Sequence, residues 1–285
     1  MDPEPRPHVV ILGGFLTEPF LYRTLRDRLL VEGASSVTIA PIHAIDWMAA
    51  GLVGLGPLLV RSGLAIRRTH RRTGGHPLLV VGHSGGGILG RLALSPVAYQ
   101  GRVAAVADAV GCLVTLGTPH GLPAAPLRWP HPGVDAAAFL ARADAVTAPD
   151  PRTALVTVGS TAVHAPDWDR APTAARLANL PYRLVVGRVG PGGGDGIVGV
   201  ELAHLTHARQ VTLPDATHGT FGRRWYGDEE IIGRWWPIAV EQWREALAAR
   251  ERTDREDAHP TQGPVAEPSV ERLDPPVPQA LHPGR

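Results

Sequence analysis

Short apolar runs and longer amphipathic stretches alternate along most of the chain. The runs are rich in β-branched residues, which predicts β-strands, whereas apolar residues that recur every three or four positions predict helices. The predicted strands are His8–Leu12, Ser36–Ala40, Leu78–Val81, Cys112–Leu116, Ala154–Val158, Tyr182–Val186 and Gln210–Leu213. The predicted helices cover residues 18–31, 57–72, 85–95, 197–207 and 226–249. This alternation predicts an α/β fold with a mostly parallel central sheet flanked by helices.

The pattern weakens in three segments, which divide the chain. Residues 1–7 are polar and rich in proline, so we expect a flexible N-terminus before one domain that covers residues 8–249. Within this domain, residues 122–180 are rich in Ala and Pro, and we expect them to form a cap or insert over the functional site. Residues 250–285 combine prolines and charges with no aromatic residue, so they cannot bury enough apolar surface to offset the entropy of ordering. We expect this tail to be disordered.

Composition narrows the classes of function. The formal net charge is +1, so no overall field would recruit nucleic acid or an anionic membrane. All 28 basic residues are Arg, which excludes mechanisms that need a Lys amine, such as Schiff-base catalysis. The single Cys112 can form neither an intramolecular disulfide nor a multi-cysteine metal site. Neither a signal peptide nor an apolar run of about 20 residues is visible, and we therefore expect a cytoplasmic protein.

The strongest functional motif follows the most apolar strand. Leu78–Val81 is apolar at every position, as expected for a central strand that is covered on both faces. Directly after it, residues 82–86 read Gly-His-Ser-Gly-Gly, a G-x-S-x-G sequence, and residues 87–94 can continue as a helix. A nucleophile elbow requires this context, because its sharp strand-to-helix turn projects the serine from the sheet. Ser84 is therefore the candidate nucleophile.

A serine nucleophile needs hydrogen-bond donors for the oxyanion that develops on the substrate. The elbow places the backbone N–H of Gly85 at the N-terminus of a helix, where it can point toward this oxyanion. Gly13 and Gly14 follow the first strand, at the place from which nucleophile-elbow enzymes take their second donor. We assign that donor to the backbone N–H of Phe15. The alternative is that this diglycine forms an ordinary strand-to-helix turn.

The serine also needs a base that accepts its proton and an acid that orients the base. Downstream of Ser84, Asp195 lies in a glycine-rich loop, and His218 follows the last predicted strand. This gives the chain order of nucleophile, acid and base that accompanies a nucleophile elbow. Asp215 is a rival acid, although it precedes His218 by only three residues. His120 is a rival base, which we interpret as a structural group beside the site because it precedes both acids.

Taken together, these motifs resemble the lipase and esterase branch of the α/β-hydrolase family. The matching pieces are Gly82-His83-Ser84-Gly85-Gly86, Leu116-Gly117-Thr118-Pro119-His120-Gly121, Asp195-Gly196-Ile197-Val198 and His218-Gly219. The resemblance covers about residues 8–249 and is strongest to bacterial lipase-like proteins of unassigned substrate. It implies hydrolysis of a carboxylic ester through an acyl-enzyme, without a cofactor or a metal. Two positions depart from the common pattern: Gly13 stands where many relatives have His, and Gly199 where many have Pro.

Other functions stay open on the same residues. A thioesterase or an acyltransferase would use the same three groups, and a non-catalytic binding protein could retain the fold without the activity. We expect a small-molecule acyl ester or lipid as the partner, with no nucleic acid and no transmembrane segment. The sequence does not indicate the oligomeric state.

Three further motifs suggest alternatives. Residues 85–90 also satisfy G-x-G-x-x-G, with Asp108 about 20 residues on, which is the pattern of a dinucleotide-binding unit. His204 and His207 are three residues apart on a predicted helix and could share a metal, but no third ligand is indicated. The apolar stretch Trp47–Val60 is either an acyl-binding lip or packing under the cap.

Overall fold

The computed structural model describes residues 4–121, 132–146, 150–164, 193–220 and 224–258. Several predictions fall outside these residues. They are the strand Tyr182–Val186, part of the cap segment 122–180, and the tail beyond residue 258.

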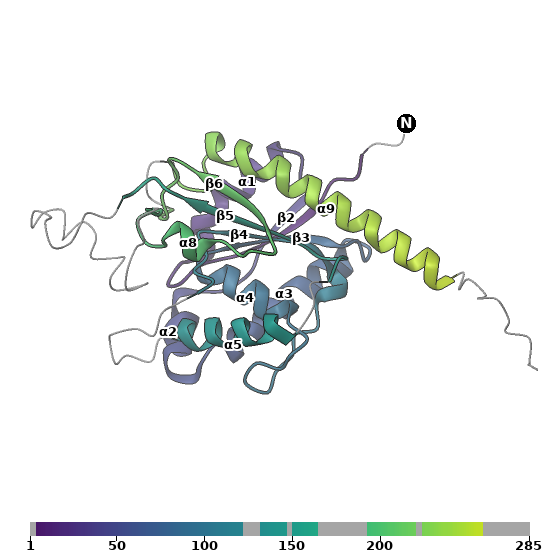
Figure 1. The fold of residues 1–285 in the computed structure, drawn as a ribbon, viewed down its shortest axis with the longest axis horizontal. Helices are drawn as coiled ribbons and strands as arrows, with labels where there is room; N and C mark the ends of the chain where they lie inside the picture. The colour runs from purple at the N-terminus through teal and green to yellow at the C-terminus, as the bar shows by residue number, and fades with distance from the viewer. Residues whose placement is uncertain (1–3, 122–131, 147–149, 165–192, 221–223, 259–285) are drawn as a thin grey trace, which may run out of the picture.

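Six strands of the described residues form one sheet (Figure 1). They are β1 (His8–Leu12), β2 (Ser36–Ile39), β3 (Leu78–His83), β4 (Val110–Leu116), β5 (Ala154–Ser160) and β6 (Arg209–Leu213). Their order is β2-β1-β3-β4-β5-β6, and all neighbouring strands are parallel. This confirms the predicted parallel sheet. Because β1 lies between β2 and β3, the strand order reverses there, and in open α/β sheets ligands bind beside such a point at the carboxyl ends of the strands.

Helices cover both faces of this sheet (Figure 1). On one face lie α1 and α9, and on the other lie α3 and α4, with α2 packed against α3 and α5 against α4. The short helix α8 contacts β5. Their bounds are α1 (Arg23–Val31), α2 (Ala44–Val53), α3 (Gly56–Arg72), α4 (Gly85–Leu94), α5 (Pro132–Val146), α8 (Val200–Ala203) and α9 (Glu229–Ala258), with 3₁₀ turns at Pro19–Tyr22 and Ala107–Ala109.

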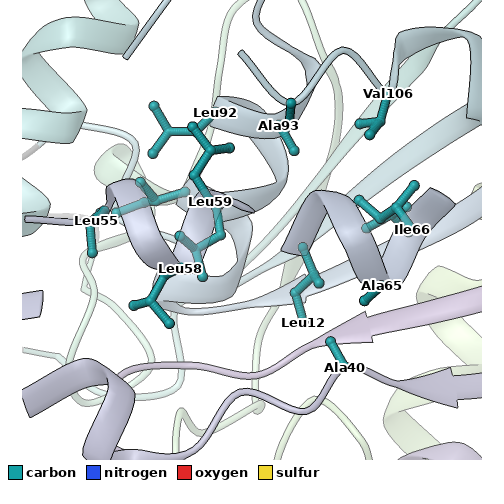
Figure 2. Packing of buried hydrophobic residues seen from close by; sticks show 14 of the residues in the cluster. Leu12, Ala40, Leu55, Leu58, Leu59, Ala65, Ile66, Leu92, Ala93 and Val106 are labelled. Atoms are coloured by element: carbon teal, nitrogen blue, oxygen red, sulfur yellow. The ribbon is translucent and has the colours of Figure 1, made fainter. Parts of the chain in front are cut away.

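The core consists of one large apolar cluster on each face of the sheet. Figure 2 shows the cluster that involves α3 and α4, where Leu59 of α3 lies beside Leu92 of α4 and Ile66 of α3 lies farther along, near Val106. The cluster on the other face includes the tryptophans of α9, of which Trp235 is fully buried. Burying one such large apolar side chain contributes about 1.5–3 kcal/mol. Strands β3 and β4 are buried at every position, as the sequence of β3 predicted.

Two helices had no counterpart in the sequence prediction, and helices α8 and α9 differ from their predicted bounds by several residues. Helix α2 begins at a capping box in which the backbone N–H of His43 donates to Asp46, a signal that the glycines of this stretch obscured. Helix α5 lies inside the predicted cap segment. Helix α9 passes the predicted end at residue 249 and reaches Ala258. Arg250 anchors this extension, because its guanidinium donates to the carbonyl oxygens of Ala107 and Asp108.

Helix α8 is much shorter than the predicted helix at 197–207. The backbone N–H groups of Ile197 and Val198 donate to the Asp195 side chain, so this part of the chain forms a turn rather than a first helical turn. The helix ends before His204, whose backbone is extended. Over the described ranges, no helix is long and apolar enough to cross a membrane.

Candidate active site

Ser84 occupies a sharp turn between β3 and α4. Its backbone angles are φ 53° and ψ −123°, a conformation that L-residues rarely adopt. Two backbone hydrogen bonds hold the turn. The N–H of Ser84 donates to the carbonyl oxygen of Leu116 at 2.9 Å, and the N–H of Gly87 donates to the carbonyl oxygen of Ser84 at 3.0 Å. The side chain is half-buried at the carboxyl end of the sheet.

The two outer glycines of the motif allow this turn because backbone approaches them closely. A Cβ atom at Gly82 would lie 2.5 Å from the Cα of Gly87, and a Cβ atom at Gly86 would lie 2.1 Å from the carbonyl oxygen of Leu12. Neither distance is compatible with a side chain. The G-x-S-x-G sequence is therefore required by the packing of α4 against β1 and β3.

The structure brings Ser84, His218 and Asp195 into one chain of hydrogen bonds. The Oγ of Ser84 lies 3.0 Å from Nε2 of His218, and Nδ1 of His218 lies 2.8 Å from Oδ2 of Asp195. A carboxylate oxygen only accepts hydrogen bonds, so Nδ1 of His218 carries the proton. In the neutral imidazole, Nε2 is then unprotonated and can accept the hydroxyl proton of Ser84.

Asp195 is almost fully buried, with 2% of its surface exposed, yet its environment favours the ionised form. Burial alone would raise the pKa of Asp195, but His218 and the backbone N–H groups of Val198 and Ile197 outweigh burial and hold this pKa below its ordinary value. Both N–H groups donate to Oδ1, at 2.7 Å and 3.0 Å. The hydroxyl of Tyr226 donates to Oδ2 at 2.9 Å, beside the bond from His218.

The Gly-Thr-Pro-His-Gly segment after β4 packs against the hydrogen-bonded chain of Ser84, His218 and Asp195. Gly117 has φ +53°, and a Cβ atom there would lie 2.5 Å from Oδ2 of Asp195 and 3.1 Å from Nδ1 of His218. The hydroxyl of Thr118 donates to the carbonyl oxygen of Ser84 at 2.9 Å. This piece thus leaves space for the acid and base and fixes the nucleophile turn.

The two predicted oxyanion donors lie next to each other. A Cβ atom at Gly85 would lie 3.4 Å from the backbone nitrogen of Phe15, and a Cβ atom at Gly14 would lie 2.9 Å from the Cβ of Ser84. The indole of Trp47 packs over this spot: its ring edge would contact the same Gly85 Cβ, and it meets the ring of Phe15 edge to face with centroids 5.7 Å apart. Trp47 is buried, whereas 42% of Phe15 is exposed.

The rival acid Asp215 and the rival base His120 interact with other residues than Ser84 and His218. Asp215 forms ion pairs with Arg224 and Arg234, at 3.0 Å and 2.6 Å. His120 is buried, and its Nδ1 accepts a hydrogen bond from Arg91 at 3.2 Å while its Nε2 lies 3.0 Å from the hydroxyl of Thr115. Arg91 can only donate, so the proton of neutral His120 is on Nε2. His120 therefore belongs to a buried structural network rather than to the base at Ser84.

The dinucleotide alternative does not fit the geometry. Asp108 precedes β4 and so lies at the amino end of the sheet, whereas Gly85 begins α4 at the carboxyl end. Protein atoms also occupy the space beside two glycines of this pattern. A Cβ atom at Gly87 would meet the side chain of Thr118, and one at Gly90 would meet Leu113. These two glycines therefore serve the packing of α4 against the sheet.

The metal alternative is equally unsupported. His204 places Nδ1 3.0 Å from the hydroxyl of Thr157 and Nε2 2.9 Å from that of Thr212, so both ring nitrogens have protein partners. In the described part of the chain, no group of three or more His, Cys, Asp or Glu side chains could hold a metal ion.

Four residues at the site have contacts that the sequence did not predict: Tyr22, Trp47, His83 and Tyr226. Their partners are distant in sequence, so no spacing reveals them. His83 differs from the other three because it lies inside the G-x-S-x-G motif. The motif does not predict its contacts, because its side chain points away from the nucleophile. The stretch Trp47–Val60 is partly packed and partly exposed: Trp47 and Leu55 are buried, whereas Met48, Leu52 and Val53 are exposed.

Comparison with known structures identifies the fold. The chain is similar to the crystal structure of lipase BlEst2 from Bacillus licheniformis in its mature form, with a TM-score of 0.60 and 16% sequence identity over 83% of this chain and 94% of that chain. It is similar to the same lipase in its propeptide form, with a TM-score of 0.57 and 17% identity over 83% of this chain and 51% of that chain. No family model and no curated protein matches the sequence. The chain has the α/β-hydrolase fold.

Proposed function

We propose that this protein is a serine hydrolase that cleaves a carboxylic ester through Ser84, His218 and Asp195. The observation that carries the proposal is the continuous hydrogen-bonded chain from the Ser84 hydroxyl through His218 to a buried carboxylate. The backbone strain at Ser84 supports it, because strained residues concentrate at functional sites. The likeness to a bacterial lipase in fold agrees with this chemistry.

The first half of the reaction transfers the acyl group to the enzyme. Nε2 of His218 takes the proton of the Ser84 hydroxyl as Oγ bonds to the carbonyl carbon of the ester. The N–H groups of Phe15 and Gly85 stabilise the negative charge on the carbonyl oxygen. The bond from carbon to the alcohol oxygen then breaks, and the departing alcohol receives the proton held by His218.

The second half repeats these steps with water. His218 takes a proton from water as its oxygen attacks the acyl carbon, and the tetrahedral species is again stabilised by Phe15 and Gly85. The bond to Ser84 Oγ breaks, Oγ recovers the proton from His218, and a carboxylic acid leaves. Asp195 stays ionised throughout and holds His218 in the tautomer that can accept a proton.

The apolar surroundings of the oxyanion position favour an apolar acyl group. Phe15 and Trp47 form an aromatic wall directly beside Gly85. Leu16 and Met48, the chain neighbours of Phe15 and Trp47, are exposed apolar residues. A carboxylic ester with a hydrocarbon chain is therefore the substrate class that we propose.

The test is turnover of p-nitrophenyl esters of increasing acyl length by the wild type and by Ser84→Ala. We expect wild-type hydrolysis and a loss on the order of 10⁶ in kcat for Ser84→Ala, because loss of the nucleophile alone removes almost the whole contribution of the triad. Ser62→Ala is the matched control, since Ser62 is fully buried but donates only to the carbonyl oxygen of Leu58 within α3.

Each outcome separates the candidates. A folded wild type that hydrolyses none of the esters would favour the binding-protein alternative. Faster turnover of a thioester of the same acyl group would identify a thioesterase, and release of a new ester when an alcohol is added would identify an acyltransferase. Equal loss of activity in Ser62→Ala would show that the effect of Ser84→Ala is one of folding.

A further inference from the structure

His83 stands directly before the nucleophile and is buried against the side of the site away from Ser84. Its ring lies 4.9 Å from the ring of His218, centroid to centroid, and 5.8 Å from that of Tyr22. Nε2 lies 3.1 Å from the backbone oxygen of His218, and Nδ1 lies 2.9 Å from the hydroxyl of Tyr22. The sequence motif gives this position no role.

The direction of each hydrogen bond follows from the chemistry of the groups. The carbonyl oxygen of His218 can only accept, so Nε2 of His83 carries a proton. Burial, and then the neighbouring His218, lower the pKa of His83 to about 3, so its ring is neutral and Nδ1 is an acceptor. Tyr22 therefore donates its hydroxyl proton to His83. Burial raises the pKa of Tyr22 to about 12, which keeps this donor protonated.

The same hydroxyl accepts a hydrogen bond from the turn that carries the oxyanion donor. The backbone N–H of Gly14 donates to it at 2.8 Å, and Gly14 directly precedes Phe15. Thr17 closes this turn by donating to the carbonyl oxygen of Gly14 at 2.7 Å. A directed chain thus runs from Gly14 through Tyr22 and His83 to the backbone of His218.

We propose that Tyr22 and His83 are positioning residues that hold the oxyanion turn and the loop of the base in one fixed relation. The inference rests on the proposed function, because Phe15 and His218 act on the substrate and the pair does not. The chain joins segments 61 and 135 residues apart. Both the donor to the oxyanion and the acceptor of the serine proton depend on it.

Positioning by Tyr22 and His83 affects the stability of the transition state more than the binding of the substrate. The oxyanion exists only after Ser84 has attacked, so a displaced Phe15 N–H lowers kcat and leaves KM almost unchanged. A misplacement of about 1 Å can lower the rate about 100-fold. For Tyr22→Phe we therefore expect a loss of about 10- to 100-fold in kcat with a change of less than about threefold in KM.

The control is Tyr99→Phe. Tyr99 is 2% exposed, against 0% for Tyr22, and it belongs to the core cluster under α3 and α4, while its hydroxyl donates to Asp135 at 3.0 Å. Removing the Tyr99 hydroxyl also deletes a hydrogen bond and so lowers the stability, but this hydroxyl lies outside the site. We expect Tyr99→Phe to keep the wild-type kcat at temperatures below its Tm.

The experiment measures kcat, KM and the inhibition constant of a trifluoromethyl ketone, which forms a tetrahedral oxyanion with the serine. In Tyr22→Phe the inhibition constant should rise by the same factor by which kcat/KM falls. If the folded fraction of Tyr22→Phe is too small, His83→Gln and His83→Leu serve instead. Gln keeps a donor for the His218 carbonyl and should retain more activity than Leu.

The outcomes decide between the two proposals. An inactive folded wild type would overturn the ester-hydrolase function and the positioning role together. An active wild type with a Tyr22→Phe variant within twofold of its kcat, or with the same loss in Tyr99→Phe, would overturn the positioning role alone. A rise in KM without a fall in kcat would also contradict it.

Discussion

Asp195 is the residue whose chemistry most narrowly determines the site. Its Oδ1 accepts from two backbone N–H groups, and its Oδ2 accepts from His218 and Tyr226. An amide at this position keeps only one accepting oxygen. If that oxygen stays with the backbone N–H groups, the NH₂ group faces His218 and forces the proton of the imidazole onto Nε2. His218 could then no longer accept the proton of Ser84.

For Asp195→Asn we therefore expect a loss of about 10⁴ in kcat, as for a triad with the wrong tautomer. Ester turnover measures this loss, and circular dichroism checks that the variant is folded. Asp215→Asn is the control, because Asp215 pairs with arginines instead of His218. Full activity in Asp195→Asn, or a comparable loss in Asp215→Asn, would contradict the assignment of the acid.

At the residue scale, motif and chain order selected Ser84, Asp195 and His218, and the structure places these side chains within hydrogen-bonding distance. Their catalytic roles stay a prediction. Sequence alone could not find Tyr226, because its bond to Asp195 spans 31 residues and follows from the course of the loop after His218. It could not find Tyr22 for the same reason.

At the element scale, the junction of β3 and α4 tolerates no side chain at two positions. We expect Gly86→Ala to lower the free energy of unfolding by about 1–3 kcal/mol or more, because its Cβ would collide with the carbonyl oxygen of Leu12 and push α4 away from β1. The nucleophile turn would move with the helix, so ester turnover should fall as well. Urea unfolding and kinetics together measure both effects.

Gly233→Ala provides the comparison within a helix. Gly233 is exposed on α9, and a Cβ atom there would meet no other atom within 4 Å. We expect this substitution to raise the stability by about 0.5–1 kcal/mol, since Ala loses less conformational freedom than Gly in a helix. Equal effects of the two substitutions would show that the close approach at Gly86 is not what the motif protects.

The elements that the sequence predicted well are those with a strong period or a strong motif. The strand His8–Leu12 has the predicted bounds, and α3 and α4 differ from them by one residue at one end. Helix α2 was missed because Gly51 weakens its helix propensity, so that its formation depends on the tertiary packing of Trp47. The prediction for helix α8 was too long, because the side chain of Asp195 accepts hydrogen bonds from the backbone N–H groups of Ile197 and Val198 and holds them in a turn.

At the scale of the whole molecule, the parallel sheet gathers distant loops at one edge. The turns after β1, β3 and β4 and the loop after β6 all leave from the carboxyl ends of strands. The alternation of strands and helices was sufficient to predict this arrangement as a class. The contacts between the loops depend on side chains far apart in the chain and were not predictable from spacing.

The buried histidines make the stability of the whole fold dependent on pH. His83 stays neutral in the folded protein because its pKa is lowered to about 3, whereas an exposed histidine titrates near 6.5. Burial and Arg91 also hold the pKa of His120 well below its ordinary value. Below about pH 6.5 the unfolded chain therefore binds more protons than the folded one, and the free energy of unfolding falls as the pH falls.

From His83 alone we expect a loss of about 2 kcal/mol between pH 6.5 and pH 5. The contribution of Asp195, whose pKa is lowered, is present above about pH 4 and is lost as the pH falls further. Urea unfolding at pH 7 and pH 5 measures the first effect, and His83→Gln should show a smaller difference between the two. Identical stabilities of the wild type at both pH values would contradict this account.

The most direct test of the central claim is covalent labelling by a fluorophosphonate, followed by intact mass and peptide mapping. An activated serine displaces fluoride and forms a stable phosphonyl ester. We expect one adduct on wild type, located on the peptide that contains Ser84, no adduct on Ser84→Ala, and slow labelling of His218→Gln. An unlabelled folded wild type, or an adduct that persists in Ser84→Ala, would contradict the assignment of Ser84 as the nucleophile.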